Sequence, residues 1–286
     1  MILLLLSSKR KRGISLNKMV MIGRQNLHLK ENELRECLEK FNFSGFRMDD
    51  ILNHSNPFAE GLFSYLGAKN IESIDASSFE DATIIHDMNT PFGEIKPSKE
   101  KFDLVLDSGT LEHVFNFPQA IKNCMDMVNK EGHFIGIYPC NNFFGHGFYQ
   151  FSSELFYRTF SEQNGFKIID VILFVDESDT KFYSVPDTNS VYQRMQFTNT
   201  KPVYIYVLAE KVSNKEIFKT YPIQMDYSHI KWKGLINKIA PQKKSGKIKK
   251  VILPNYLKNI IKAFLNIKAE DDRSFRKPYF SSYKLR

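Results

Sequence analysis

The chain has little cysteine and no long apolar segment. Its 286 residues contain no run of about 18 apolar residues, the length that a transmembrane helix needs, so none is predicted. The three cysteines, Cys37, Cys124 and Cys140, are scattered and have no paired spacing. Such cysteines argue against a disulfide framework and against a cysteine-based zinc site, and they suit a reducing compartment such as the cytoplasm.

The apolar start of the chain is also short. Residues 1–6 are apolar, and the cations of residues 9–12 follow them. A secretory signal has a longer apolar core and places its cations first. We therefore predict that residues 1–17 form a basic leader, either a short helix or a disordered segment.

Acidic residues are scarce at both ends of the chain, so the net charge of +8 is unevenly distributed. Residues 231–286 hold 16 Lys and Arg but 3 Asp and Glu, and residues 1–18 contain cations and no acid. The part between them is net acidic. The high isoelectric point therefore does not indicate nucleic-acid binding by the body of the protein, and no recognised nucleic-acid motif is present.

What the sequence does contain is an alternation of short apolar runs and helical patterns. This alternation predicts an α/β fold with a doubly wound, Rossmann-like sheet. No helix separates the last two strands, so we expect them to be antiparallel neighbours at one edge of the sheet, and the loop between them, 176–202, is too polar for the core. The expected strands are 18–22, 70–74, 83–85, 102–106, 134–138, 166–175 and 203–209, and the expected helices are 30–41, 57–66, 118–129 and 152–160.

The predicted α/β domain spans residues 18–212. About 50 residues separate the first strand from the end of the second, whereas a nucleotide-binding βαβ unit has about 20. We therefore expect an insertion at residues 26–56. Residues 213–286 are expected to form a basic, partly helical C-terminal extension.

One predicted βαβ unit, residues 102–139, carries polar residues where its first strand ends. The polar turn 107–110 follows that strand and leads toward a helical pattern and a second strand. Ligands of open α/β sheets bind at the carboxyl ends of the strands. We therefore expect the functional site at this end of the sheet.

Short segments of this unit resemble a known family. FDLVLD (102–107) with LEHV (111–114) is similar to the segment after the fourth strand of class I S-adenosylmethionine-dependent methyltransferases, and NKEGHF (129–134) resembles their turn before the fifth strand. The resemblance covers about residues 18–212. It implies S-adenosylmethionine as cofactor and a seven-stranded, mostly parallel sheet with an antiparallel C-terminal hairpin. In addition, NNFFGHGFYQF (141–151) is similar to a bacterial subgroup often encoded among surface-polysaccharide genes.

The resemblance implies that residues after the second and third strands bind the nucleoside. Asp75 would bind the ribose hydroxyls through charge-assisted hydrogen bonds, with Ala76 beside it. Asp87 would bind the adenine amino group, and the Met88 backbone amide would bind a ring nitrogen. The residues themselves leave an alternative open, since Asp75 could form a turn or a helix cap and Asp87 an Asx turn.

The remaining implied cofactor contacts lie after the first and fourth strands. Asp107 and Ser108 would border the sulfonium, although Asp107 could instead cap the following helix. The family has a glycine-rich loop after its first strand, where this chain offers Gly23 and Arg24. The Arg24 guanidinium could bind the cofactor carboxylate, and Glu60 could bind its amino group.

Three residues are candidates for the acceptor side. Methyl transfer requires alignment, and it requires a base where the acceptor is a hydroxyl or a protonated amine. His113 and His146 are the candidate bases, and Tyr149 is a candidate hydrogen-bond partner of the acceptor. The aromatic surroundings of His146 fit a ring-shaped acceptor such as a sugar, but each of the three could instead be structural. Three other histidines lack ligand spacing with any acid pair, so no metal is expected.

The basic segment 231–265 mixes cations with apolar residues, partly at helical spacing. It predicts either a helix on an anionic membrane surface or a helix packed on the domain with a solvated lysine face. Acidic polysaccharide intermediates and anionic lipids would both suit its charge. We expect a cytoplasmic protein, and the first alternative would place it peripherally on the inner membrane face.

Two functions therefore stay open. One is a methyltransferase that uses S-adenosylmethionine and acts on a saccharide or another small molecule. The other is a non-catalytic, methyltransferase-like binding or scaffold module that serves glycan assembly at the membrane. The acids Asp75 and Asp87 favour the first, whereas the missing glycine-rich loop and the basic tail favour the second.

Overall fold

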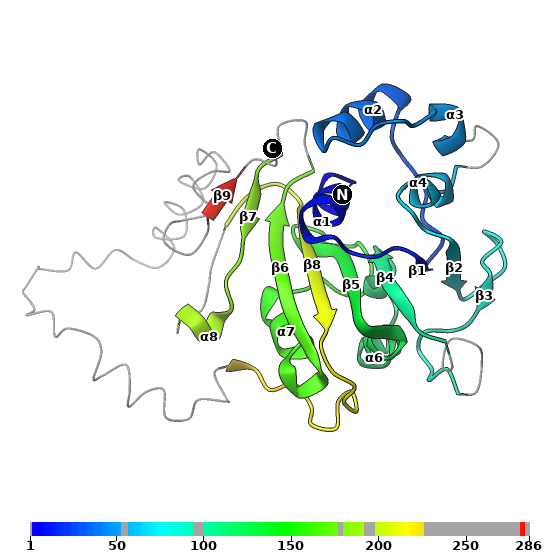
Figure 1. The fold of residues 1–286 in the computed structure, drawn as a ribbon. Coiled ribbons are helices and arrows are strands. Elements are labelled where there is room, and N and C mark those ends of the chain that lie inside the picture. Colours follow the sequence, from blue (N-terminus) through cyan, green and yellow to red (C-terminus); the bar gives the residue numbers. More distant parts are fainter. Residues whose placement is uncertain are drawn as a thin grey trace, which may run out of the picture.

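The computed structural model describes residues 2–52, 57–93, 100–176, 180–191, 198–225 and 281–283. One sheet with helices on both faces forms the body of the protein (Figure 1). Its strands are β1 (Lys18–Ile22), β2 (Asn70–Asp75), β3 (Ile84–Ile85), β4 (Phe102–Ser108), β5 (Val128–Asn141), β6 (Phe166–Phe174), β7 (Phe182–Ser184), β8 (Val203–Lys211) and β9 (Ser281–Tyr283). The helices are α1 (Ile2–Arg12), α2 (Glu31–Lys40), α3 (Met48–Ile51), α4 (Glu60–Tyr65), α6 (Phe117–Met127), α7 (Ser153–Thr159) and α8 (Thr188–Val191), with the 3-10 turns η1 (Leu111–His113) and η2 (Glu162–Asn164).

The sheet has the strand order β3-β2-β1-β4-β5-β8-β6-β7-β9. The first five strands in this order are parallel, and β8 is antiparallel to both β5 and β6. The predicted α/β class and the antiparallel pairing of the last two predicted strands are therefore confirmed. Because β7 and β9 extend the sheet beyond β6, the described residues form nine strands rather than seven, and the antiparallel pair does not form the edge of the sheet.

Strand β7 corrects the prediction that the loop 176–202 is too polar for the core. Phe182 and Tyr183 are buried, and β7 pairs with β6. Two aromatic side chains on opposite faces of a short strand bury enough surface to hold it against the sheet, although its neighbours in the sequence are polar.

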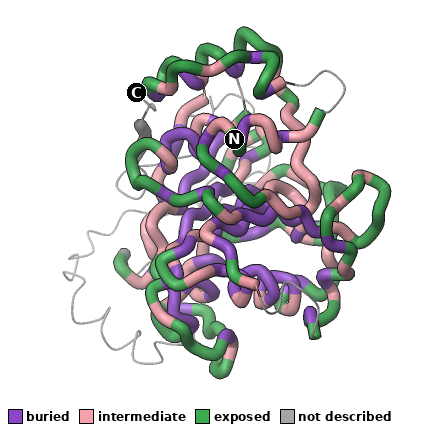
Figure 2. Tube along the Cα trace, turned by 45° about the vertical axis from the view of Figure 1, so that its right-hand side comes forward, coloured by how far each residue is buried: buried purple, intermediate pink, exposed green. Residues whose placement is uncertain are grey.

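The side chains of β1 alternate between two buried clusters, one on each face of the sheet. Met19 and Met21 belong to one buried cluster, which includes side chains of α1, α2 and α4. Val20 and Ile22 belong to the other, which includes side chains of α6 and α7. Successive side chains of a strand point to opposite faces, so one short apolar run supplies both layers. Buried residues accordingly follow the strands through the middle of the molecule (Figure 2).

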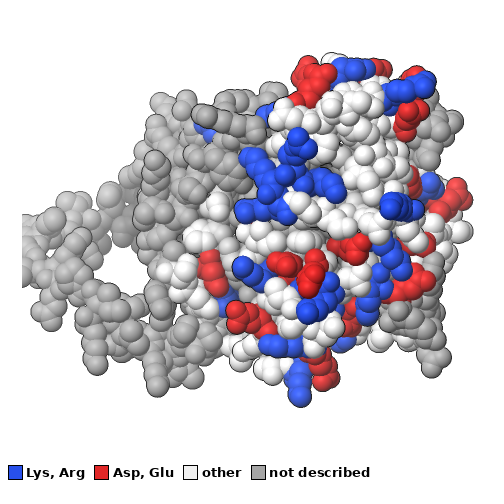
Figure 3. Space-filling model, in the orientation of Figure 1, with Lys and Arg blue, Asp and Glu red and all other residues white. Residues whose placement is uncertain are grey.

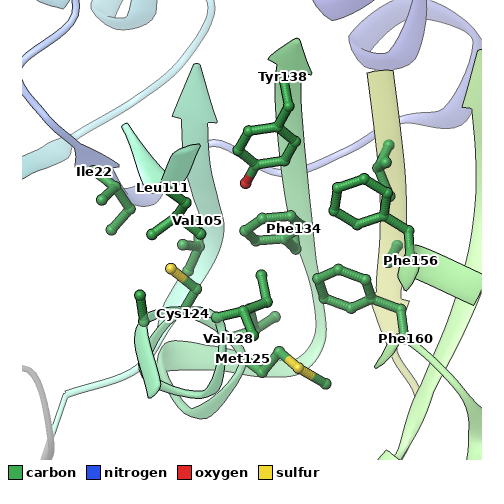
Figure 4. Packing of buried hydrophobic residues seen from close by; sticks show 14 of the residues in the cluster. Ile22, Val105, Leu111, Cys124, Met125, Val128, Phe134, Tyr138, Phe156 and Phe160 are labelled. Atoms are coloured by element: carbon green, nitrogen blue, oxygen red, sulfur yellow. The ribbon is translucent and has the colours of Figure 1, made fainter. Parts of the chain in front are cut away.

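The face covered by α6 and α7 is rich in aromatic side chains. Phe134 and Tyr138 of β5 stack on Phe160 and Phe156, with ring centroids 4.7 and 5.4 Å apart (Figure 4). Cys124 of α6 is buried in the same cluster. Burial raises the pKa of its thiol well above the usual value, as expected of a packing residue rather than a nucleophile.

Helix α1 is part of the packed domain, which differs from the separate basic leader predicted for residues 1–17. Leu4 and Leu6 are buried, and Ser8 Oγ lies 2.7 Å from the Tyr206 hydroxyl in a hydrogen bond. Arg12 forms an ion pair with Asp170 of β6 at 3.3 Å. The cations of the last turn of α1 lie on one face of the molecule, where they form a basic surface (Figure 3).

The two ends of the segment between β1 and α4 lie side by side and are joined by backbone hydrogen bonds. Asn26 and Phe58 form an antiparallel bridge, the Leu27 amide donates to Pro57 O, and the Ala59 amide donates to Gln25 O. The intervening residues include α2 and α3, which pack on the same face as α1. The residues between these two points are therefore an insertion. They account for the long spacing between the first two strands, because the rest of the connection is short.

The described helices include none with the length and apolar content that a membrane crossing requires. The predicted basic segment 231–265 lies outside the described residues.

Candidate functional site

The loops that follow β1, β2 and β4 are joined by hydrogen bonds at the carboxyl edge of the sheet. The Gly23 amide donates to Ile74 O at 2.7 Å, and the Thr110 hydroxyl donates to Ile22 O at 2.8 Å. These bonds hold together the carboxyl ends of the parallel strands β2, β1 and β4. This is the edge at which open α/β sheets bind ligands.

Gly23 is required by this arrangement. Its φ of 68° lies in the left-handed region, and a Cβ built on it would come within 2.6 Å of Thr110 Oγ1. One glycine thus allows the chain to turn away from β1 while the loop after β4 packs against it.

Arg24 and Glu60, both predicted to contact the methionine end of a cofactor, pair with each other. Arg24 Nε donates to Glu60 Oε1 at 2.6 Å, and Arg24 Nη1 donates to Glu80 O at 2.8 Å. The guanidinium also lies 3.9 Å from the centre of the Phe58 ring. Glu60 Oε2 is buried without a hydrogen bond. The two residues are thus brought together near the end of β1, and they satisfy most of each other's charge.

The two predicted nucleoside acids lie at the ends of neighbouring strands, Asp75 as the last residue of β2 and Asp87 two residues after β3, and both form turns. Asp75 Oδ1 accepts from the Ser77 amide at 2.9 Å, and Asp87 Oδ1 accepts from the Asn89 amide at 2.9 Å. The bonds from Asn89 hold the pKa of the exposed Asp87 below its usual value. Neither Oδ2 accepts a hydrogen bond from the described residues, so each acid keeps one oxygen available for a ligand.

The two predicted neighbours of these acids differ in exposure. Ala76 is exposed beside Asp75. The Met88 side chain is 5% exposed and belongs to the core between the sheet and α6, so it cannot form a pocket wall. Its backbone amide is the part that could still serve a ligand.

Asp107 was predicted to border the sulfonium, and the structure corrects this assignment. Its side chain is 0% exposed, and its oxygens accept from the Thr110 amide at 3.0 Å and the Leu111 amide at 3.2 Å. Both oxygens therefore hold the turn that leads into η1. Burial, and secondarily the charge of Glu112, raises the pKa of Asp107 from 3.8 to about 7.

Ser108 lines a cavity of about 300 Å³ beside this turn. Three ionisable side chains face one another there. Glu112 Oε1 lies 3.6 Å from His146 Nε2 and 4.0 Å from His113 Nε2, and the two imidazole rings are 5.0 Å apart. The full set of lining residues is Ser108, Gly109, Glu112, His113, Ile137, Pro139, His146, Phe174, Asp176 and Tyr204.

The predicted candidate bases therefore meet, and they meet around an acid that the sequence analysis did not assign. Glu112 is 1% exposed, and its Oε2 has no hydrogen bond. Burial raises the pKa of Glu112 from 4.5 to about 7 and lowers that of His113, whose pKa the neighbouring His146 lowers further. The signal in the sequence is the pair Glu112-His113 shortly after a strand, where an acid beside a histidine can pair with a second imidazole.

Backbone bonds hold the segment that carries His146 against the turn that carries Glu112. The amides of Phe148 and Tyr149 both donate to Glu112 O, at 2.8 and 3.2 Å. Gly147 has a φ of 71°, and a Cβ there would come within 2.9 Å of the same carbonyl. The contact therefore requires glycine at this position.

Tyr149 contributes to this contact rather than to the cavity. Its hydroxyl donates to Phe115 O at 2.6 Å, and its ring packs beside Phe151 and Phe117. The cavity wall does not include Tyr149. The predicted hydrogen bond from Tyr149 to an acceptor is therefore not supported by its position, because its proton is already used to anchor the segment.

The raised pKa values of Asp107 and Glu112 predict that stability falls as the pH rises. Both carboxyls titrate at about 7 in the folded protein and at 3.8 and 4.5 in the unfolded chain, so the folded state holds more protons between these values. In EDTA-containing buffer, we expect the free energy of unfolding to decrease by up to about 5 kcal/mol between pH 5 and pH 8, about half of it from each carboxyl. Urea unfolding at both pH values measures this difference. Glu112→Gln should remove about half of it, and an unchanged slope would contradict the assignment.

Comparison with known proteins gave structural matches alone. No protein-family model and no curated protein sequence matched the chain. A TehB-like S-adenosylmethionine-dependent methyltransferase from Corynebacterium glutamicum is 9% identical over 72% of this chain and 87% of its own, with a TM-score of 0.37. An S-adenosylmethionine-dependent methyltransferase from Clostridium acetobutylicum is 10% identical over 73% and 89%, with a TM-score of 0.29.

A third similar solved structure is that of a polyamine synthase rather than a methyltransferase. The C9 mutein of the branched-chain polyamine synthase from Thermus thermophilus, in complex with N4-aminopropylspermidine and 5'-methylthioadenosine, is 10% identical over 76% of this chain and 58% of its own. Its TM-score is 0.36. Since each of these scores is below 0.5, the assignment of a function rests on the residues of this chain.

Proposed function

We propose that this protein transfers a methyl group from S-adenosylmethionine to a hydroxyl group of a small-molecule acceptor, with a saccharide as the preferred class. The observation that carries the proposal is the pairing of two features at one edge of the sheet. Acids with an available oxygen end β2 and β3, and a cavity with two imidazoles opens beside β4. The first feature suits a nucleoside, and the second suits an acceptor that loses a proton.

The cofactor side is assigned to the residues that end β1, β2 and β3. Asp75 Oδ2 would accept from the ribose hydroxyls, with the exposed Ala76 next to it, and Asp87 Oδ2 would accept from the adenine amino group. The Met88 amide would donate to a ring nitrogen. When bound, S-adenosylmethionine supplies an activated methyl group, so alignment is the main task of these residues.

The methionine end is assigned to Gly23, Arg24 and Glu60. Gly23 keeps side-chain atoms away from the place where the loops after β1 and β4 meet. Arg24 would bind the carboxylate and Glu60 the amino group, which requires their mutual ion pair to open or to be shared with the ligand. An ion pair of this kind is a ready partner for a zwitterion, because each charge of the ligand finds its opposite.

The acceptor side is assigned to His113 and His146, with Ser108 and Gly109 in the wall of the same cavity. An imidazole nitrogen accepts the proton of the acceptor hydroxyl. The Glu112 carboxylate, 3.6 and 4.0 Å away, then stabilises the imidazolium that forms. The partly exposed ring of Tyr204 in the wall, which stacks on the buried Phe174, offers a surface for a ring-shaped acceptor.

The mutual pairing of Arg24 and Glu60 favours a second function, a non-catalytic binding or scaffold module in glycan assembly. A closed ion pair would then be a structural contact and no methyl donor would bind. The proposed anionic membrane surface belongs with either function, since it depends on the basic segment 231–265.

Release of S-adenosylhomocysteine tests the proposed reaction. We expect the full-length protein to release it in the presence of S-adenosylmethionine and at least one member of a panel of sugars, nucleotide sugars and phenols. His113→Gln and His146→Gln together should slow this release at least about 100-fold, the usual contribution of a general base. The exposed His28, which lies outside the site, provides the matched control as His28→Gln. Product release at the same rate in the double variant would contradict the assigned bases, and the absence of both cofactor binding and turnover would favour the scaffold function.

A further inference from the structure

The buried, unpaired carboxylate of Glu112 requires an explanation. Its side chain is 1% exposed, and Oε2 has no hydrogen-bond partner. Burial of a carboxylate oxygen without a partner is costly, and such groups in proteins are ordinarily hydrogen-bonded, paired or coordinated to a metal. Oε1 approaches the two histidines at 3.6 and 4.0 Å, beyond ordinary hydrogen-bond length. A ligand between the three side chains would satisfy all of them.

The chemistry of these side chains suits a first-row divalent metal ion. Two imidazole nitrogens and one carboxylate oxygen are a common donor set for Zn²⁺ and its neighbours, which leave at least one coordination position open. One ligand atom from each residue lies within 4.8 Å of the other two. Bonds of about 2.0–2.1 Å in tetrahedral geometry would place the ligand atoms about 3.3 Å apart.

Only small movements would convert the observed arrangement into a coordination shell. The Glu112–His146 and Glu112–His113 separations exceed the tetrahedral value by less than about 1 Å. The imidazoles are 49% and 52% exposed, so both can rotate. The backbone of Glu112 is fixed, because its carbonyl accepts hydrogen bonds from the Phe148 and Tyr149 amides.

The backbone fixes the two elements that supply the ligands. Glu112 and His113 belong to η1, whereas His146 belongs to a segment that follows β5. The close contact of Gly147 with Glu112 O locks this segment against η1. Such preorganisation distinguishes a built site from exposed histidines that meet by chance.

We propose that Glu112, His113 and His146 bind one divalent transition-metal ion, with Zn²⁺ as the best match, and that the open coordination position faces the 300 Å³ cavity. From the sequence no metal was expected, because three other histidines lack ligand spacing with any acid pair. Binding of the ion does not depend on methyl transfer. With the ion bound, the two imidazoles would be its ligands instead of free bases, and the ion would polarise an acceptor hydroxyl held at the open position. That role alone rests on the proposed function.

Titration with Zn²⁺ tests the site directly. The full-length protein, freed of metal with a chelator and then desalted, is titrated with Zn²⁺ by calorimetry and with Co²⁺ by visible absorption. We expect one equivalent per chain with micromolar or tighter affinity, and the absorption of a low-symmetry Co²⁺ site with nitrogen and oxygen ligands. Glu112→Gln and His146→Gln should each weaken binding at least about 10-fold to 100-fold. His28→Gln should leave it unchanged.

Controls separate this proposal from loss of fold and from failure of the proposed reaction. Glu112→Gln is nearly isosteric and removes a buried charge, so its circular dichroism should match that of the unaltered protein. Asp75→Ala should bind Zn²⁺ as tightly as the unaltered protein, since Asp75 lies outside the cavity. The proposal is overturned if Zn²⁺ binds weakly or not at all. It is also overturned if the two cavity variants bind Zn²⁺ as the unaltered protein does, in which case the cluster is an acid–base pair without a metal.

Discussion

Replacement of Asp75 by alanine is expected to lower the affinity for S-adenosylhomocysteine about 100-fold. A carboxylate that accepts from two hydroxyls contributes about 1.5–3 kcal/mol per bond, and loss of about 3 kcal/mol corresponds to this factor. In the structure, Asp75 Oδ1 is held by Ser77, which leaves Oδ2 free of partners among the described residues. The residue is therefore oriented before any ligand arrives.

Thermal unfolding with and without ligand measures this change. At a ligand concentration 100 times the dissociation constant, binding stabilises the folded protein by about 2.7 kcal/mol, and a 100-fold weaker site retains about 0.4 kcal/mol. The rise in melting temperature should thus fall from roughly 5–10 °C to roughly 1–2 °C. Asp49→Ala, which removes an exposed acid on α3, is the control for net charge. Equal ligand shifts in the two variants would show that Asp75 does not contact the nucleoside.

Replacement of Gly23 by alanine is expected to destabilise the protein by about 3 kcal/mol. Alanine at a φ of 68° costs about 1 kcal/mol relative to glycine, and its Cβ would lie 2.6 Å from Thr110 Oγ1, a collision that adds about 1–3 kcal/mol. The melting temperature should fall by roughly 6–12 °C. Because Thr110 bonds to Ile22 O, the change should also loosen the loop after β4.

Gly13→Ala is the matched control for Gly23→Ala. Gly13 has a similar φ of 66°, but nothing lies within 4 Å of a Cβ built there, so its replacement should cost about 1 kcal/mol through backbone strain alone. In the Gly23→Ala background, Thr110→Ala should then be less harmful than in the unaltered protein. Equal losses for the two glycines would contradict the close approach of the loops after β1 and β4.

The strands of the central sheet could be predicted from the sequence because each is a short apolar run between turn residues. β1 begins and ends at Lys18 and Ile22 in both the prediction and the structure. Helix α1 was predicted as one of two alternatives and β7 was not predicted, for different reasons. The apolar residues of α1 precede a block of cations and gave no amphipathic signal, and β7 has few apolar residues within a polar stretch.

The candidate site could be predicted in part, since residues after strands were expected to meet at one edge. Sequence could not separate the two roles of Asp107, because a carboxylate after a strand serves equally well as a ligand contact and as an acceptor of turn amides. Burial decides between them. Two contacts could not be predicted, those of Arg24 with Glu60 and of Glu112 with His146. Each depends on how two distant segments pack, and the sequence pattern of a single segment does not contain this information.

The central claim is that the residues at the ends of β2 and β3 bind the nucleoside of S-adenosylmethionine, and one measurement tests it most directly. The full-length protein is titrated with S-adenosylhomocysteine in a calorimeter. One equivalent bound per chain with a dissociation constant in the micromolar range is the predicted result. The absence of any heat of binding at millimolar ligand would contradict the claim.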